Sequence, residues 1–164
     1  MAACGGLSAL GGDSRKIESV VSEAKKIFKL YPVGRVQKKG ETAAILIFDK
    51  YTDALQGLDD FSHVFVLYWF DKNDTVHKRS ILQVHPRGNK KNPLTGVFAC
   101  RAPVRPNLIA LSLCKIVSVK GGTVYIDKID AFDGSPVLDL KPYIPGIDSP
   151  KKAVEMPDWL GRGG

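Results

Sequence analysis

The stretch KIVSVKGGTVYIDK, residues 115–128, predicts a β-hairpin and thereby favours a β-sheet fold. Its central pair, Gly121-Gly122, supplies the two positive-φ residues that a tight two-residue turn requires. Closing the turn at this pair sets Val119 opposite Val124, so that apolar side chains face each other across the hairpin. We therefore expect two neighbouring antiparallel strands here.

Farther from the turn, the same register predicts one apolar pair and one unfavourable pair. Val117 faces Ile126, which keeps one face of the hairpin apolar. Lys115 then faces Lys128, and like charges directly opposite each other destabilise a sheet. Either the strand leaves the core at this point or a β-bulge intervenes, and both alternatives stay open.

Around the hairpin lie further short runs that are rich in β-branched and aromatic residues and are separated by Gly, Pro, Asn and Asp. Together they predict about seven strands, over residues 31–36, 43–48, 64–70, 81–84, 96–99, 108–119 and 124–129. The absence of long intervening helices favours a barrel or sandwich over a doubly wound sheet. The run 64–70 is apolar throughout, so we expect both of its faces to be covered.

The 164 residues predict one mostly β domain with a short helix before it. Apolar residues at helical spacing and a Ser14 N-cap predict an amphipathic helix over residues 14–28. We expect residues 1–13 to form a flexible tail and residues 14–164 to form a single-domain β-barrel. No apolar run approaches the roughly 20 residues that a membrane-spanning helix needs.

Several familiar classes of site lack their sequence signatures. The three cysteines are odd in number and not spaced as metal-ligand pairs, which argues against a disulfide framework or a zinc site and favours a reducing cytosol. No GxGxxG follows a strand, and there is no Walker A loop, GxSxG elbow or HExxH motif. These absences disfavour a Rossmann-type enzyme and a hydrolase.

The net charge of +7 resides in one part of the chain. Residues 72–105 hold eight Lys and Arg side chains against the single carboxylate of Asp74, so the rest of the chain is neutral. A basic third on a neutral scaffold is typical of a protein with a polyanionic partner such as a nucleic acid. The alternative is a basic surface that only maintains solubility.

The segment CRAPVRPN, residues 100–107, carries two arginines on a stiff backbone. Pro103 and Pro106 remove backbone donors, so the segment cannot be an ordinary inner strand. Arg101 and Arg105 could therefore present planar forks to a carboxylate or phosphate with little ordering cost. The alternative is an edge loop whose arginines pair with local acids.

Two further segments combine turn chemistry with charge. Asp133-Gly134-Ser135-Pro136 predicts a tight turn that exposes backbone amides and a carboxylate, which could bind an adenosine or a sulfonium or could be only a turn. Asp71-Lys72, at the end of the apolar strand, could contact a ligand or form a solvated turn. His63, at the start of that strand, is expected to be a hydrogen-bonded structural residue.

Taken in order, these segments resemble the TrmO family, also called TsaA-like or YaeB-like. The resemblance covers most of the chain from Tyr31 to Ser149. The matching blocks are YPVGRV (31–36), GL (57–58) with FSHV (61–64), FDK (70–72), VHPRG (84–88), TGVFA (95–99), RAPVRPN (101–107) and DGSPVLDLKPY (133–143).

This resemblance implies a β-barrel enzyme that uses S-adenosylmethionine to methylate tRNA. The acceptor would be N6 of threonylcarbamoyladenosine at position 37, in the anticodon stem-loop. The protein would be a homodimer with the cofactor bound near the subunit interface, and the cysteine usage places it in the cytoplasm. The cofactor contacts carried over by motif position are Asp71, Lys72, Arg101, Leu111, Asp133, Gly134, Ser135 and Pro136. The resemblance and the basic segment together suggest tRNA contacts at Arg87, Lys90, Lys91, Arg105 and Asn107.

The acceptor nitrogen of such a substrate is urea-like and needs its proton held or removed, whereas methyl transfer itself requires mainly positioning and exclusion of water. Asp133 is the candidate carboxylate beside the sulfonium, and no catalytic base is assigned. The chain has QKKGE at residues 37–41 where many relatives carry Pro-Arg-Gln-Pro, and it has Ala110 and Ser135 where Gly and Thr are usual. The competing hypothesis is a non-catalytic RNA-binding barrel of the same fold.

Overall fold

The computed structural model describes residues 27–40 and 42–161. The chain divides into two units, residues 1–30 and residues 31–164, and the fold described below is that of the second unit. The helix predicted over residues 14–28 lies outside the described residues except for Ile27 and Phe28, which belong to no helix or strand. The boundary predicted between residues 13 and 14 also lies outside them.

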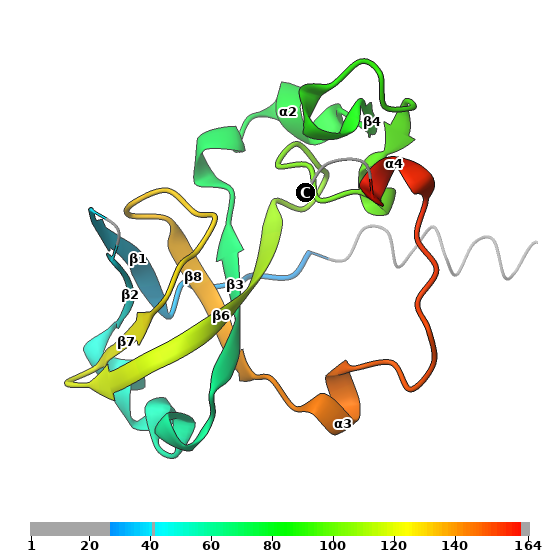
Figure 1. Cartoon of the computed structure of the whole chain (residues 1–164). Helices are drawn as coiled ribbons and strands as arrows, with labels where there is room; N and C mark the ends of the chain where they lie inside the picture. The colour runs from blue at the N-terminus through cyan, green and yellow to red at the C-terminus, as the bar shows by residue number, and fades with distance from the viewer. Residues whose placement is uncertain (1–26, 41, 162–164) are drawn as a thin grey trace, which may run out of the picture. The chain divides into compact units, whose positions relative to one another are not determined.

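The second unit is built around a closed antiparallel barrel of six strands, which confirms the predicted mostly β fold (Figure 1). The order around the barrel is β1-β2-β7-β6-β3-β8. The strands are β1 (Gly34–Lys39), β2 (Thr42–Ile47), β3 (His63–Trp69), β6 (Ile109–Lys120), β7 (Thr123–Ile126) and β8 (Pro136–Pro142).

The hairpin of β6 and β7 follows the predicted register next to its turn and departs from it farther away. Val119 pairs with Val124 as predicted, and Gly121 and Gly122 both have positive φ. The predicted pairing of Val117 with Ile126 is wrong, because a β-bulge between Ile116 and Ser118 places Ile116 opposite Ile126 and leaves Val117 65% exposed.

The bulge also removes the unfavourable lysine pair that the simple register implied. After the shift, Lys115 lies opposite Asp127 instead of Lys128. The Lys115 amide donates to Asp127 Oδ1 at 2.9 Å, and the Asp127 amide donates to the Lys115 carbonyl at 3.1 Å. Of the two alternatives left open by the sequence, the bulge is the one that the structure adopts.

Strand β8 was not predicted, although it closes the barrel between β1 and β3. Proline occupies both of its ends, Pro136 and Pro142, positions at which a strand tolerates a residue without an amide hydrogen. Of the predicted strands, 81–84 shortens to β4 (Gln83–Val84) and 96–99 is replaced by β5 (Thr95–Gly96) and the 3₁₀ helix η5 (Val97–Ala99). Strands β4 and β5 form a separate two-stranded sheet.

The barrel interior is filled by small and β-branched side chains. Val36, Ile45, Val64, Val124 and Val137 are almost completely buried, and each comes from a different strand. Along β3, Val64, Val66 and Tyr68 are buried, while the alternate residues Phe65, Leu67 and Trp69 are half-buried on the outer face. The run predicted to be covered on both faces is thus fully covered only on the inner face within one chain.

The remaining elements are short helices. They are η1 (Asp49–Leu55), η2 (Leu58–Asp60), η3 (Asp71–Asn73), α2 (Val76–Ser80), η4 (Pro86–Gly88), α3 (Pro145–Asp148) and α4 (Asp158–Gly161). The connection from β3 to β6 holds η3, α2, η4, η5 and the small sheet, and it contains the whole basic segment. No helix within the described residues is long and apolar enough to cross a membrane.

Candidate functional site

Most of the predicted site residues lie at one end of the barrel. At this end β1, β3 and β7 finish and β2, β6 and β8 begin, as the antiparallel pairings require. The β3–β6 connection starts and finishes here, and so does the segment between β7 and β8. Segments that are far apart in sequence therefore meet around the same opening.

The Asp133–Pro136 segment is a tight turn that is pinned to β1. Gly134 has φ of 81°, which its lack of a side chain allows, and its amide donates to the Val36 carbonyl at 2.9 Å. The Val36 amide in turn donates to the Ser135 carbonyl at 2.9 Å. The turn is therefore held at a fixed position against the barrel wall.

Ser135 connects this turn with the end of β3. Its side chain is 2% exposed, and its hydroxyl lies 3.4 Å from Asp71 Oδ1, to which it donates. Asp71 also forms an ion pair with Lys72, with 3.4 Å between Nζ and Oδ2. The structure thus brings together Asp71, Lys72 and the 133–136 turn, which the sequence analysis grouped only through the family resemblance.

Asp133 is held by β1 through a contact that the sequence analysis missed. The Lys38 amide donates to Asp133 Oδ1 at 2.8 Å, and Lys38 Nζ donates to the Ala131 carbonyl at 2.7 Å. Lys38 belongs to the segment that stands where many relatives carry Pro-Arg-Gln-Pro, so the position of that segment is a signal that could have identified it. One oxygen of the Asp133 carboxylate therefore has a structural role.

Arg101, Arg105 and Leu111 line one cavity of about 750 Å³ beside the start of β6. Its other walls include Phe70, at the end of β3, and the 128–130 segment that follows β7. Apolar strand residues and two arginines thus line the same cavity. A volume in the range of about 300–1,000 Å³ is typical of small-molecule sites, and the wall of this cavity combines apolar residues with four charged ones, Arg101, Arg105, Lys128 and Asp130.

Tyr68 is a buried polar residue at this cavity that sequence reasoning did not single out. Its hydroxyl donates to the Asp130 carbonyl, and its ring packs edge-on against Phe70 with 5.6 Å between centroids. Burial raises the pKa of the Tyr68 hydroxyl. Tyr68 therefore remains a hydrogen-bond donor at neutral pH and fixes the 128–130 wall of the cavity to β3.

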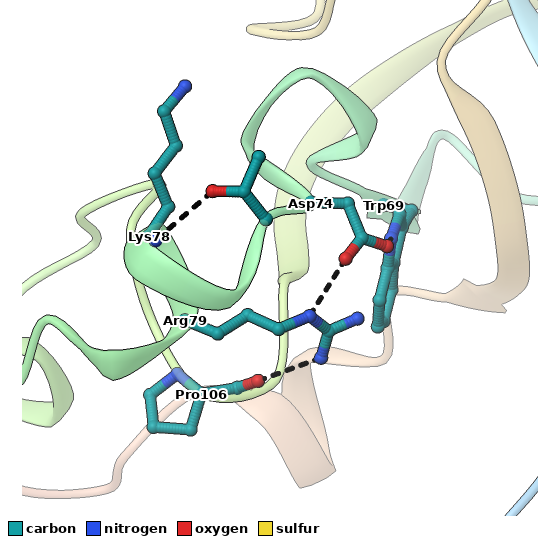
Figure 2. A network of polar contacts seen from close by, with 6 residues as sticks. Trp69, Asp74, Lys78, Arg79 and Pro106 are labelled. Carbon is teal, nitrogen blue, oxygen red and sulfur yellow. Dashed lines mark hydrogen bonds and ion pairs between the residues drawn. The ribbon is translucent and has the colours of Figure 1, made fainter.

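A polar network fixes the arginine-bearing loop to the end of β3, as Figure 2 shows. Arg79, from α2, donates through Nε to Asp74 Oδ1 at 2.8 Å and through Nη1 to the Pro106 carbonyl at 3.0 Å. Trp69 Nε1 donates to Asp74 Oδ2 at 3.0 Å, and the Arg79 guanidinium lies 5.2 Å from the Trp69 ring centroid. The network orients the loop that carries Arg101 and Arg105.

A second cavity, of about 1190 Å³, is lined by residues of the β3–β6 connection and by Trp159 and Leu160 of helix α4. Arg87, Lys90 and Arg101 line it, so Arg101 borders both cavities. Lys91 and Asn107 are exposed and line neither of the two cavities. The structure therefore brings Arg105 to the first cavity, Arg87 and Lys90 to the second, and Arg101 to both.

His63 is hydrogen-bonded, as expected, with Nδ1 2.9 Å from the Ser62 hydroxyl and its ring edge-on to Tyr143. Within the described part of the chain, no group of three His, Cys, Asp or Glu side chains is placed to hold a metal ion. The arrangement offers arginine side chains, a fixed carboxylate and a cavity with apolar and charged walls, which suit binding and positioning of a ligand.

Comparison with known proteins agrees with these features. Residues 20–149 match the family described as the tRNA-methyltransferase O N-terminal domain. A Methanocaldococcus jannaschii protein named probable S-adenosyl-L-methionine-binding protein is 42% identical over 125 residues, which cover 76% of this chain and 99% of that one. The human tRNA (adenine(37)-N6)-methyltransferase is 45% identical over 109 residues, covering 66% of this chain and 24% of that enzyme.

Solved structures show the same fold. The crystal structure of TrmO from Pseudomonas aeruginosa superimposes with a TM-score of 0.59 at 27% sequence identity, covering 79% of this chain and 62% of that one. The chain thus spans nearly all of the archaeal relative, less than two thirds of the bacterial protein and about a quarter of the human enzyme.

Proposed function

The chain belongs to the family of the tRNA-methyltransferase O N-terminal domain, and from this membership we propose that it transfers a methyl group from S-adenosylmethionine to N6 of an adenosine in tRNA. The observation that carries the proposal is the family match over residues 20–149, which includes every residue that lines the first cavity. The activities named for the human and archaeal relatives support the reaction and the cofactor.

The first cavity fits S-adenosylmethionine in size and in chemistry. Its apolar wall beside Leu111 suits an adenosine ring, and the Arg101 fork suits the methionine carboxylate. Asp71, which follows Phe70 of the cavity wall, and the Asp133–Pro136 turn bonded to it line neither cavity. They lie at the same end of the barrel, where they would hold the remaining polar groups. The bound cofactor supplies an electrophilic methyl group on a sulfonium.

The protein residues would act mainly by positioning and by exclusion of water. Asp133 is fixed by the Lys38 amide, so its carboxylate can face a cationic centre without reorganising during the reaction. Tyr68 holds the 128–130 wall of the cavity in place, and Arg79 holds the loop that carries Arg101 and Arg105. These contacts favour alignment of the acceptor nitrogen with the methyl group.

We propose further that the acceptor is threonylcarbamoyladenosine at position 37. The threonyl group of this nucleoside carries a carboxylate, for which the Arg105 fork, in the same cavity as Arg101, is the candidate partner. Arg87, Lys90, Lys91 and Asn107 would then contact the anticodon stem-loop around it. An unmodified adenosine has no carboxylate for this fork. Comparing methyl transfer to tRNA with and without the threonylcarbamoyl group therefore tests which of the two adenosines is the acceptor.

A homodimer is the assembly that we propose. The outer face of β3 and β6 carries three adjacent pairs of apolar residues, Phe65 with Leu113, Leu67 with Leu111, and Trp69 with Ile109. All six are half-buried or exposed in the single chain. A second copy on this face would bury them and would border the cavity through Leu111 and Leu113.

The compartment that we propose is the cytoplasm. Cys100 and Cys114 are free thiols in the described part of the chain, and Cys114 is buried in the barrel interior. Burial raises the pKa of the Cys114 thiol to about 12, which keeps it protonated and unreactive. Unpaired thiols are typical of proteins in a reducing environment.

Isothermal titration calorimetry with S-adenosylmethionine tests the cofactor, and mass spectrometry of tRNA incubated with protein and cofactor tests the reaction. We expect saturable heat and a mass gain of one methyl group on threonylcarbamoylated tRNA. The competing hypothesis of a non-catalytic RNA-binding barrel predicts no specific heat with the cofactor and no mass gain. That result would reject the enzyme.

A further inference from the structure

An exposed aromatic side chain stands at the wall shared by the two cavities. Phe98, in η5, is 81% exposed and lines both the cavity of about 750 Å³ and the cavity of about 1190 Å³. Burying a phenylalanine side chain is worth about 1.5–3 kcal/mol, so a ligand that covered this ring would gain free energy of that order. The neighbouring Val97 is 2% exposed and anchors η5.

The second cavity has the composition of a site for single-stranded nucleic acid. A second aromatic residue, the half-buried Trp159 of α4, also lines it. The basic residues at its wall are Arg87, Lys90 and Arg101, and none of the described residues that line it is acidic. Aromatic faces for bases and cations for phosphates are the two features that proteins use to bind unpaired nucleotides.

The backbone around the cavity is fixed before any ligand binds. Asn92 Nδ2 donates to the Pro86 carbonyl at 2.9 Å, and His85 Nδ1 lies 2.8 Å from the Asn92 carbonyl. Arg87 is the only non-glycine residue with positive φ among those described, at 60°. Such a conformation persists only where the surroundings hold it, so the 85–92 loop is a rigid wall.

We propose that the second cavity binds a nucleotide of the tRNA loop next to the acceptor adenosine, with its base stacked on Phe98. Trp159 covers the same base or the next one, and Arg87 and Lys90 contact the adjoining phosphates. This inference rests on the proposed function, because it takes the acceptor to lie in the first cavity and its neighbour in the second. A volume of about 1190 Å³ exceeds the range of about 300–1,000 Å³ for small-molecule pockets, which fits a polymer segment better than a metabolite.

A synthetic RNA stem-loop with 2-aminopurine in its loop, adjacent to the acceptor adenosine, tests the proposal with the full chain. Stacking on an aromatic ring quenches 2-aminopurine fluorescence. We expect quenching on binding to the parent protein and loss of quenching with Phe98→Ala, with affinity for the stem-loop reduced roughly 5- to 150-fold. Phe98→Tyr should restore both, and Trp159→Ala should weaken binding in the same direction.

The controls separate stacking from general damage. Tyr125→Ala removes an exposed aromatic residue from β7 that lines neither cavity, and it should leave affinity and quenching unchanged. Duplex RNA of equal length has no unpaired base, so Phe98→Ala should not alter its binding. Equal loss on duplex RNA, or unchanged quenching in Phe98→Ala, would each overturn the proposal.

The same measurements distinguish this inference from the proposed function. Methyl transfer by the parent protein together with quenching that is independent of Phe98 would reject the nucleotide site and leave the enzyme intact. Quenching that depends on Phe98, without cofactor heat or methyl transfer, would reject the enzyme and support the nucleotide site alone.

Discussion

Arg101 lines both cavities, so its replacement tests the role of each. If its fork binds the methionine carboxylate, Arg101→Ala should weaken S-adenosylmethionine binding by about 2–3 kcal/mol, measured by calorimetry. Lys120→Ala is the matched control, since it removes one positive charge at the opposite end of β6. Unchanged affinity in a folded Arg101→Ala protein would remove this residue from the cofactor site.

Asp74 reports whether the network of Figure 2 is formed in solution. Its pKa is lowered from the ordinary 3.8, first by the hydrogen bond from Arg79 and then by that from Trp69. A lowered pKa in the folded state means that the stabilisation is present above about pH 3.8 and is lost as the pH falls through the folded-state value. Arg79→Gln should raise the Asp74 pKa toward 3.8, measured by carboxyl-carbon NMR titration.

Lys78→Gln provides the control for this titration. This variant removes a positive charge from the residue before Arg79. The backbone amide of residue 78 still donates to the Thr75 hydroxyl, at 3.2 Å in the parent protein, and so α2 keeps its N-cap. The Asp74 pKa should therefore stay low. An Asp74 pKa that is equal in the parent and in Arg79→Gln would show that the Arg79–Asp74 contact does not form.

At the scale of elements, β1 requires a glycine at its start. A Cβ atom on Gly34 would lie 2.3 Å from the Leu46 carbonyl oxygen and 3.1 Å from Ile47 Cα, both on the paired strand β2. Because backbone cannot move aside as a flexible side chain can, Gly34→Ala should destabilise the protein by about 1–3 kcal/mol or more, measured as a shift of the urea midpoint. Gly146→Ala, with open space around its Cβ, should leave the midpoint nearly unchanged.

The elements that sequence predicts well are those specified by neighbouring residues. The Gly121-Gly122 turn fixes the Val119–Val124 pair because both strands start from it. The bulge at Val117 stayed one of two alternatives, because it relieves a contact between charges across the sheet. The closing strand β8 was missed, because it begins with turn residues and proline. Short-range patterns do not encode such partners.

In the candidate site, too, the sequence predicts features that depend on neighbouring residues and misses those that depend on distant ones. Arg101, Arg105 and Leu111 are predicted residues that share a cavity, because the stiff loop and the start of β6 are adjacent in sequence. Lys38 and Tyr68 were missed because their partners, Asp133 and Asp130, are 95 and 62 residues away. A lysine in a strand and a tyrosine in an apolar run give no local sign of such contacts.

For the whole molecule, the outer face of β3 and β6 predicts self-association. Light scattering should give a dimer mass at micromolar concentration, and Leu113→Glu should shift the mass toward the monomer, because a carboxylate would be buried without a partner. Ile147→Glu, on α3, changes an exposed apolar residue that belongs to none of the three pairs and should leave the dimer intact. A monomeric parent protein would exclude a cofactor site completed by a second copy.

The last prediction concerns the basic β3–β6 connection and the salt dependence of tRNA binding. Lys90 and Lys91 are exposed on the loop that Asn92 and Pro86 hold in place, so they can contact phosphates with little ordering cost. Each neutralised phosphate contributes a slope of about −0.7 to −0.9 in log affinity against log salt.

Replacing both lysines with alanine should therefore flatten the slope by about one to two units, measured by fluorescence anisotropy over a salt series. Cofactor affinity should not change, because neither lysine lines the first cavity. Lys151→Ala with Lys152→Ala removes an equally exposed pair from the segment between α3 and α4 and should keep the parent slope. If the Lys90 and Lys91 variant also keeps the parent slope, then this loop does not contact tRNA, and its charge serves only the solubility of the surface.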